Sequence, residues 1–205
     1  MRRDLRRDIG RGRPPEGIRC FWAIELPEET RSALEAFCRA ARARGIRAGW
    51  PAPTSYHLTL CFMGRAAPEA VDMMIRRVET DLAETESRVL ELAVRGMGAF
   101  PDVTRPAVCW AGIEVLAGDL AGIRARVYEA AREAGCGPDG KAFHPHVTLA
   151  RSRSSGESGA LAAWLREAGC PAFGSPFRAE RLVLFHSELR PEGARHTPRA
   201  VVPLG

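Results

Sequence analysis

A four-residue pattern, histidine-apolar-threonine-apolar, occurs twice in this chain of 205 residues, at 57–60 (HLTL) and at 146–149 (HVTL). Each copy lies in a stretch of alternating, β-prone residues that is typical of a strand. Successive side chains of a strand point to opposite faces, so the apolar residues of each copy can enter a core while the histidine and the threonine share the other face. The pattern therefore predicts two equivalent strands that each present an imidazole and a hydroxyl together.

The expected elements around the two copies also repeat. The order strand, helix, strand, helix, strand occurs once before about residue 100 and again, less regularly, after it, which predicts two related lobes. The expected strands are 20–24, 56–62, 89–94, 107–115, 143–151 and 181–187, with an edge strand at 200–203. The expected helices are 27–45, 68–82, 116–134 and 160–168, and a polar loop is expected at 153–159.

Composition places the chain among soluble globular proteins, because 45% of its residues are hydrophobic and 27% are charged. No apolar stretch approaches the roughly 20 residues that cross a bilayer, and no secretory core follows the arginine-rich N-terminus. We therefore expect a cytoplasmic protein that makes no contact with membranes. Residues 1–17 combine glycines, prolines and charges without apolar periodicity, which predicts a flexible basic tail before a single bilobal domain at 18–205.

The net charge of +5 does not by itself indicate a nucleic-acid partner. Residues 1–19 contain seven arginines and three acidic residues, a net +4, so the remaining 186 residues carry a net charge of only +1. Six cysteines occur singly, with no C-x-x-C pair, which argues against a structural zinc site or a disulfide framework. We expect them to be small buried apolar residues in a reducing compartment.

The duplicated pattern suits chemistry at a phosphate. In-line displacement at phosphorus needs a base that takes a proton from water and an acid that protonates the departing oxygen, and a pair of histidines, here His57 and His146, can fill both roles without a metal. The hydroxyls of Thr59 and Thr148 can bond the non-bridging oxygens as negative charge accumulates there. The alternative is that all four are ordinary residues on a half-exposed sheet face.

Two such motifs in a bilobal chain of this length resemble the signature of the 2H phosphoesterase superfamily, and within it the RNA 2′,3′-cyclic phosphodiesterase family, also named for a 2′-5′ RNA ligase activity. Further segments resemble the family in the expected order, from about residue 18 to the C-terminus. They are 20–27 (CFWAIELP), 56–64 (YHLTLCFMG), 98–101 (GAFP), 108–112 (VCWAG), 143–151 (FHPHVTLAR) and 182–189 (LVLFHSEL).

The resemblance implies an α+β fold of two pseudo-symmetric lobes, each a mainly antiparallel sheet with outer helices, with the active site in a groove between the sheets. It implies metal-independent hydrolysis of a 2′,3′-cyclic phosphate at an RNA end to a 2′-phosphomonoester, without a cofactor, and possible reverse ligation. His57 would be the general acid, His146 the general base, and Thr59 and Thr148 would hold the phosphate. Arg151 would add a cation, although strict strand alternation puts it on the face opposite Thr148 unless the chain turns there.

Several other residues bear on the site. Phe143 and Trp50 are candidates for stacking a base, because aromatic faces accept any base. His144 can share a face with His146 as a third histidine or, more simply, as a solvated neighbour. Tyr56 and His186 depart from the family pattern and could alter what lies beside the phosphate. His196 is expected to be an exposed loop residue.

Two rival functions stay open at this point. One is another 2H activity, such as cyclic-nucleotide hydrolysis, and the other is a non-catalytic module that binds RNA ends. A metal-dependent nuclease would need carboxylates near the histidines, and neither motif has an Asp or Glu within three residues. The expected partners are RNA ends or short oligonucleotides with a 2′,3′-cyclic phosphate, and the protein is expected to be a monomer.

Overall fold

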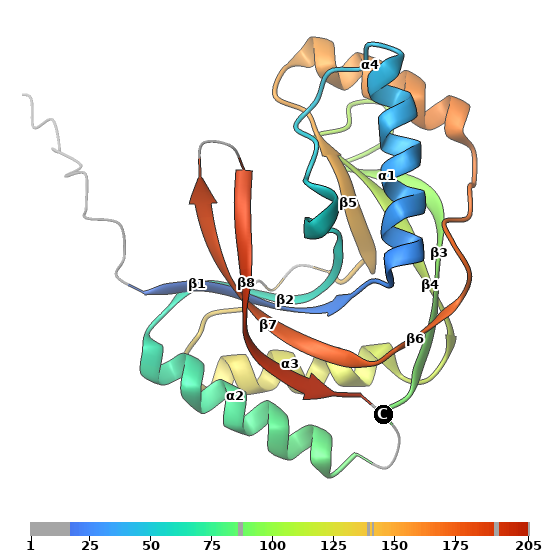
Figure 1. The fold of residues 1–205 in the computed structure, drawn as a ribbon. Coiled ribbons are helices and arrows are strands. Elements are labelled where there is room, and N and C mark those ends of the chain that lie inside the picture. The colour runs from blue at the N-terminus through green and yellow to red at the C-terminus, as the bar shows by residue number, and fades with distance from the viewer. Residues whose placement is uncertain (1–16, 86–87, 139, 141, 191–192, 205) are drawn as a thin grey trace, which may run out of the picture.

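The computed structural model describes residues 17–85, 88–138, 140, 142–190 and 193–204. Residues 1–16 of the predicted tail therefore lie outside the described residues. The described residues form four helices, a short 3₁₀ turn and two four-stranded sheets (Figure 1). The elements in chain order are β1 (Ile18–Glu25), α1 (Glu28–Ala43), η1 (Pro53–Ser55), β2 (His57–Ala66), α2 (Pro68–Ala83), β3 (Leu90–Phe100), β4 (Val108–Ala117), α3 (Leu120–Glu133), β5 (His146–Arg151), α4 (Ser155–Ala168), β6 (Phe177–Ala179), β7 (Arg181–Arg190) and β8 (Gly193–Pro203).

Both sheets are antiparallel, which confirms the expected α+β fold. The first sheet has the order β2-β1-β7-β8 and the second has the order β5-β4-β3-β6. The expected order strand, helix, strand, helix, strand on either side of residue 100 is confirmed, as β1-α1-β2-α2-β3 and β4-α3-β5-α4-β6. The two halves do not each build one sheet, because β3 lies in the second sheet and the chain returns to the first sheet with β7 and β8. In each half the motif strand, β2 or β5, is the edge strand of its sheet.

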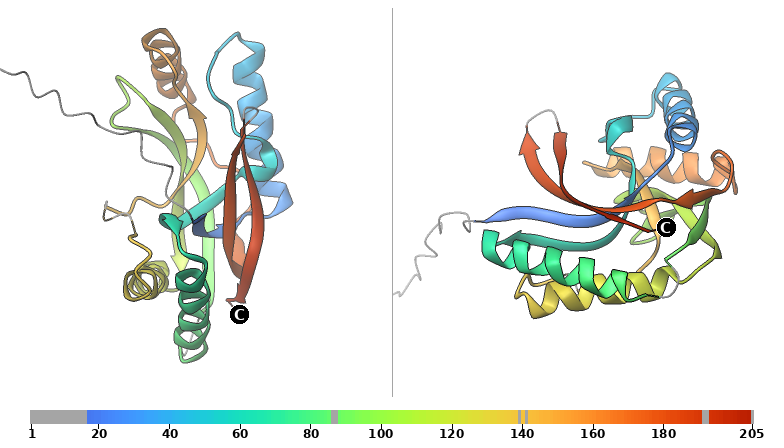
Figure 2. Two further views of the ribbon diagram at one scale, coloured as in Figure 1. Left: turned by 90° about the vertical axis from the view of Figure 1, so that its left-hand side faces the viewer. Right: turned by 60° about the horizontal axis from the view of Figure 1, so that its bottom comes forward.

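One face of each sheet packs with the helices in a large apolar cluster. The apolar residues of both motifs, such as Leu58 and Val147, are fully buried in it. The helices α2 and α3 lie side by side below the sheets (Figure 1 and Figure 2), and α1 contacts α4 through the rings of Phe37 and Trp164, 5.1 Å apart. The opposite face carries His57 and His146, and we call it the histidine face of the two sheets.

Each motif strand contains an irregularity in its pairing just after the threonine. In β2, Thr59 pairs with Ala23 and Cys61 pairs with Trp22, so one residue of β2 is extra. Strand β5 has the same irregularity, because Thr148 pairs with Trp110 and Ala150 pairs with Cys109. A bulge of this kind reverses the alternation of faces beyond it.

Several element boundaries differ from expectation for local reasons. Helix α3 begins at Leu120 and not at 116, because β4 continues to Ala117 and Gly118 then adopts a φ of +90°. The loop expected at 153–159 is mostly helix, since the Ser154 side chain accepts a hydrogen bond from the Glu157 backbone N–H and caps α4. Strand β6 was not expected, and β8 is much longer than 200–203.

Five of the six cysteines are buried, as expected, whereas Cys170 is exposed. None of the helices formed by the described residues combines the length and the apolar character needed to cross a membrane.

Candidate active site

The two motif strands lie side by side where the two sheets meet. A backbone bridge reinforces this junction, because the loop before β2 pairs with the end of β5. The Gly49 N–H donates to the Arg151 carbonyl at 2.8 Å, and the Arg151 N–H donates to the Gly49 carbonyl at 2.9 Å. The fold therefore brings together two motifs that are 89 residues apart in sequence.

Each motif histidine is held by the backbone carbonyl two residues before it. His57 Nδ1 lies 2.7 Å from the Ser55 oxygen, and His146 Nδ1 lies 2.6 Å from the His144 oxygen. A carbonyl can only accept, so Nδ1 of each ring donates, and in the neutral ring Nε2 is left as the proton acceptor. The two imidazoles thus have the same tautomer and the same type of anchor.

Aromatic rings on the histidine face fix the plane of each imidazole. The Phe21 ring stacks on His57 with centroids 4.7 Å apart and planes at 25°. The Phe100 ring meets His146 edge-on at 5.1 Å, and the Trp110 ring lies 6.0 Å away. Each imidazole is therefore confined between its carbonyl anchor and an aromatic wall.

The same surroundings keep both imidazoles neutral. Burial, together with the nearby His196, His146 and Arg151, lowers the pKa of His57 to about 4, although the Ser55 carbonyl acts in the opposite direction. Burial also lowers the pKa of His146, with Arg151 and His144 acting in the same direction. Both Nε2 atoms are therefore unprotonated near pH 7 and can accept a proton.

The two threonines lie on the same face as the histidines. Thr59 and Thr148 are both half-buried, and within the described part of the chain neither hydroxyl makes a hydrogen bond to the protein. These hydroxyls are therefore available to donate to an anion placed between the two histidines.

Arg151 lies near the two histidines because of the bulge in β5. Leu149 and Ala150 are both fully buried, so the alternation shifts by one residue and the exposed Arg151 follows on the face of His146 and Thr148. Arg151 affects the pKa values of both His57 and His146, which indicates that it lies close to them. The equivalent residue of β2 is Phe62. Its ring packs against a small apolar cluster on the histidine face, formed by Phe21, Ala23, Val183 and Phe185.

The two aromatic candidates lie elsewhere in the described structure. Trp50 packs edge-on against Trp164 of α4 at 5.6 Å. Phe143 lies under the Arg124 guanidinium of α3 at 4.8 Å. Both rings border the main apolar cluster, and among the contacts of the described residues neither touches a motif histidine. A stacking role for them stays a prediction.

His196 was missed as a residue of the site. It is not in an exposed loop but in β8, opposite Ser187, and its ring meets His57 at 90° with centroids 5.5 Å apart. Its Nδ1 is buried and has no hydrogen-bond partner in the part of the chain that the structure describes. The stretch around it (GARHTPRAVVP) is too polar to indicate a strand, so no sequence signal pointed to this position.

The remaining sequence candidates have defined places. Tyr56 is buried on the other side of the strand, and its hydroxyl donates to Glu35 of α1 at 3.4 Å. His186 lies directly opposite Cys20, whose side chain is fully buried in the main cluster, so it shares that face and does not lie beside the motifs. The exposed His144 contributes its carbonyl to the anchor of His146.

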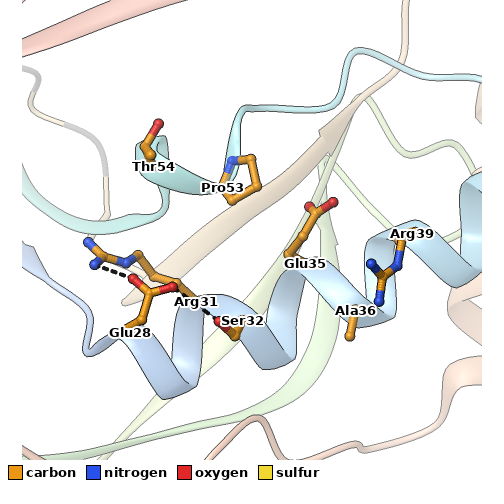
Figure 3. A pocket seen from close by; sticks show the side chains of 8 residues that line it. All are labelled: Glu28, Arg31, Ser32, Glu35, Ala36, Arg39, Pro53 and Thr54. Atoms are coloured by element: carbon orange, nitrogen blue, oxygen red, sulfur yellow. Dashed lines mark hydrogen bonds and ion pairs between the residues drawn. The ribbon is translucent and has the colours of Figure 1, made fainter.

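Two hollows lie outside the motif pair. One, of about 370 Å³, lies between α1 and η1 and is lined by charged side chains that bond one another, such as Arg31 and Glu28 at 2.7 Å (Figure 3). The other, of about 460 Å³, lies beside Trp110 and His144 at the edge of the histidine face. Within the described ranges, no group of three or more His, Cys, Asp or Glu side chains is placed to hold a metal ion.

Known proteins are similar to this chain in sequence. A family model described as the 2′-5′ RNA ligase superfamily matches residues 25–190, a range that includes both motifs. An RNA 2′,3′-cyclic phosphodiesterase of Aeropyrum pernix is 36% identical over 121 residues, which are 59% of this chain and 66% of that protein. One of Geobacillus stearothermophilus is 29% identical over 185 residues, 90% of this chain and 57% of that protein. This chain thus spans less than two thirds of either relative.

A third relative matches over most of both chains. The RNA 2′,3′-cyclic phosphodiesterase of Thermus thermophilus is 34% identical over 192 residues, which cover 88% of this chain and 87% of that protein. The crystal structure of the Thermus thermophilus protein TT0787 superposes with a TM-score of 0.73 at 28% identity, covering 91% of this chain and 98% of that chain.

Proposed function

This chain belongs to the 2′-5′ RNA ligase superfamily, and on that premise we propose that it hydrolyses the 2′,3′-cyclic phosphate at the end of an RNA strand. The observation that carries the proposal is the pair of motif histidines, His57 and His146, anchored identically through Nδ1 on two strands that meet at the junction of the sheets. Two such imidazoles can act on opposite sides of one phosphorus atom.

In the proposed reaction His146 acts as the base and His57 as the acid. His146 Nε2 takes a proton from water, the water oxygen forms a bond to phosphorus, and the bond from phosphorus to the 3′ oxygen breaks. His57 Nε2 gives a proton to that 3′ oxygen, which leaves a 2′-phosphomonoester and a free 3′ hydroxyl. If the 5′ hydroxyl of a second RNA strand attacks phosphorus in place of water, the same proton transfers break the bond to the 3′ oxygen and leave a 2′-5′ linkage, which would be ligation.

The low pKa of His57 is compatible with an acid role once the substrate has bound. The cyclic phosphate carries one negative charge, and an anion beside an imidazole favours its protonated form. The hydroxyls of Thr59 and Thr148 and the guanidinium of Arg151 would stabilise the charge that grows on the non-bridging oxygens. Every proton in this scheme is moved by a side chain of the protein, so the proposal requires no metal and no cofactor.

The test uses a short RNA that ends in a 2′,3′-cyclic phosphate, with product identified by ³¹P NMR. The wild-type protein should yield the 2′-phosphomonoester, also in excess chelator. The variants His57→Ala and His146→Ala should each lower kcat by about 10²–10⁴-fold, the usual contribution of a general acid or base. His186→Ala, which removes a histidine from the other face of the first sheet, is the matched control.

Three results would contradict the proposal. They are RNA left intact by the wild type, normal turnover by both motif variants, or loss of activity in chelator. Turnover of a cyclic mononucleotide with no action on RNA would assign the site to a different 2H activity. Tight binding of RNA ends without turnover would make the protein a binding module.

A further inference from the structure

Arg19, near the start of β1, lies on the histidine face and is held there by two neighbours. Its Nη1 donates to the hydroxyl of Ser187, which is only 2% exposed. Its guanidinium also covers the Phe62 ring, with Cζ 4.6 Å from the ring centroid. Both partners are neutral, so they orient the guanidinium without compensating its charge.

The charge of Arg19 is not balanced by an acidic group. Among the described residues Arg19 forms no ion pair, whereas arginines elsewhere pair with carboxylates, as Arg181 does with Glu25 at 2.7 Å. Burial lowers the pKa of Arg19, and the neighbouring cations Arg65 and Arg151 lower it further. A half-buried cation among other cations is unfavourable in the free protein, and an anion bound there would relieve that cost.

The position of Arg19 relative to the motif histidines suits the next phosphate of an RNA strand. His57 stacks on Phe21, and Arg19 lies two residues before Phe21 on the same strand face, with about 7 Å between their Cα atoms. Besides burial, the charge of Arg19 lowers the pKa of His196, whose ring centroid lies 5.5 Å from that of His57. Arg19 therefore lies beside the motif pair, where the next phosphate of an extended strand would pass. Arg151 influences both Arg19 and His57, so these groups lie around a common region.

We propose that Arg19, oriented by Ser187 and Phe62, forms a second anion site that binds the phosphodiester immediately before the terminal cyclic phosphate. This inference rests on the proposed function and names the substrate class of the same site. The guanidinium has several N–H groups, of which one bonds Ser187, so others can reach the phosphodiester oxygens. The contact is to the backbone, so it carries no preference for base sequence.

The consequence is a preference for oligonucleotides over cyclic mononucleotides, which have no preceding phosphodiester. The measured quantity is kcat/KM for a dinucleotide that ends in a 2′,3′-cyclic phosphate, divided by kcat/KM for the corresponding 2′,3′-cyclic mononucleotide. Arg19→Met should lower this ratio by about tenfold or more, the usual effect of losing a charge-assisted hydrogen bond. Arg19→Lys keeps the charge but not the planar guanidinium, so its ratio should lie between those of the wild type and Arg19→Met.

Arg126→Met is the matched control, because it removes the same charge from an exposed position on α3. It should keep the wild-type ratio. Ser187→Ala should lower the ratio less than Arg19→Met, since the guanidinium stays but loses its orientation. A ratio that Arg19→Met leaves unchanged would overturn the proposal.

A binding measurement separates failure of this proposal from failure of the proposed function. Calorimetry compares the affinity for a dinucleotide that ends in a 3′-phosphate with that for a nucleoside 3′-monophosphate, and it needs no turnover. The dinucleotide should bind at least tenfold more tightly to the wild type, and Arg19→Met should abolish that advantage. Equal affinities in the wild type would refute the second anion site, whether or not the protein hydrolyses RNA.

Discussion

A backbone carbonyl, and not a carboxylate, orients the imidazole of each motif histidine. The carbonyl oxygens of Ser55 and His144 fix the tautomer without adding a full negative charge beside the ring. A carboxylate in their place would favour the imidazolium and raise the pKa. The protein therefore keeps its two rings neutral, and under the proposed function the negative charge that favours protonation of one ring arrives with the substrate.

This arrangement predicts how stability depends on pH. The folded protein holds His57 at a pKa of about 4, and an unfolded histidine has a pKa near 6.5. Between these values the unfolded state binds more protons, so the free energy of unfolding should fall as pH falls from about 7 to 4. Over that range the free energy of unfolding of His57→Gln should fall by about 3 kcal/mol less than that of the wild type.

Denaturant unfolding at several pH values measures this difference, with His186→Gln as the control for loss of one histidine outside the histidine face. If the wild type and His57→Gln lose the same stability over that range, burial does not keep the His57 imidazole neutral in the folded protein.

At the scale of single elements, the alternation of side chains between the two faces of a strand predicted only part of the candidate site. It placed His57 and Thr59 together, and His146 and Thr148 together, because these pairs precede the bulges. It placed Arg151 on the wrong face because the bulge depends on pairing with β4, which is distant in sequence. The sequence does contain one sign of the two bulges. The last leucine of each motif is followed directly by another small or apolar residue, Cys61 or Ala150, where strict alternation would place a polar one.

A glycine in β3 makes room for the aromatic wall of His146. A Cβ atom at Gly98 would lie 2.1 Å from Cη2 of Trp110, inside the ring's own volume. Gly98→Ala should therefore destabilise the protein by about 1–3 kcal/mol through overpacking. It should also lower kcat, because the displaced Trp110 ring lies 6.0 Å from His146.

Chemical denaturation and steady-state kinetics test this expectation together. Gly159→Ala is the matched control, because Gly159 lies within α4 with no atom near its Cβ position, and alanine there should stabilise the protein by about 0.5–1 kcal/mol. Equal stabilities for Gly98→Ala and the wild type would mean that the Trp110 ring can move at little cost.

At the scale of the whole molecule, the sequence predicted two lobes but not how the chain divides between them. Local patterns locate strands, whereas sheet membership depends on pairing between distant segments. Strand β8 carries little apolar patterning, yet it completes the first sheet and supplies His196. Net charge is a similarly incomplete guide to the site. Arg19 is one of the seven arginines of residues 1–19 that were counted apart from the rest of the chain, yet it lies on the histidine face.

Charge near the site predicts a modest salt dependence. If the protein contacts two phosphates, the cyclic one and the one before it, log kcat/KM should fall with log salt concentration with a slope of about −1.4. The Arg19→Met variant would contact only the cyclic phosphate and should show a slope of about −0.7. Kinetics in a potassium chloride series measure both slopes. Equal slopes for the two proteins would indicate that Arg19 makes no phosphate contact.

The return of the chain to the first sheet sets the order in which the site can form during synthesis. His57 and its ring neighbour Phe21 are translated early, but the strand that flanks β1 on its other side is β7, and His196 follows in β8. A nascent chain that has emerged only to the end of β5 already contains both motifs, although half of the first sheet is missing. We therefore expect the proposed activity to appear only after the C-terminal hairpin has been made, so that partly made chains should be inactive.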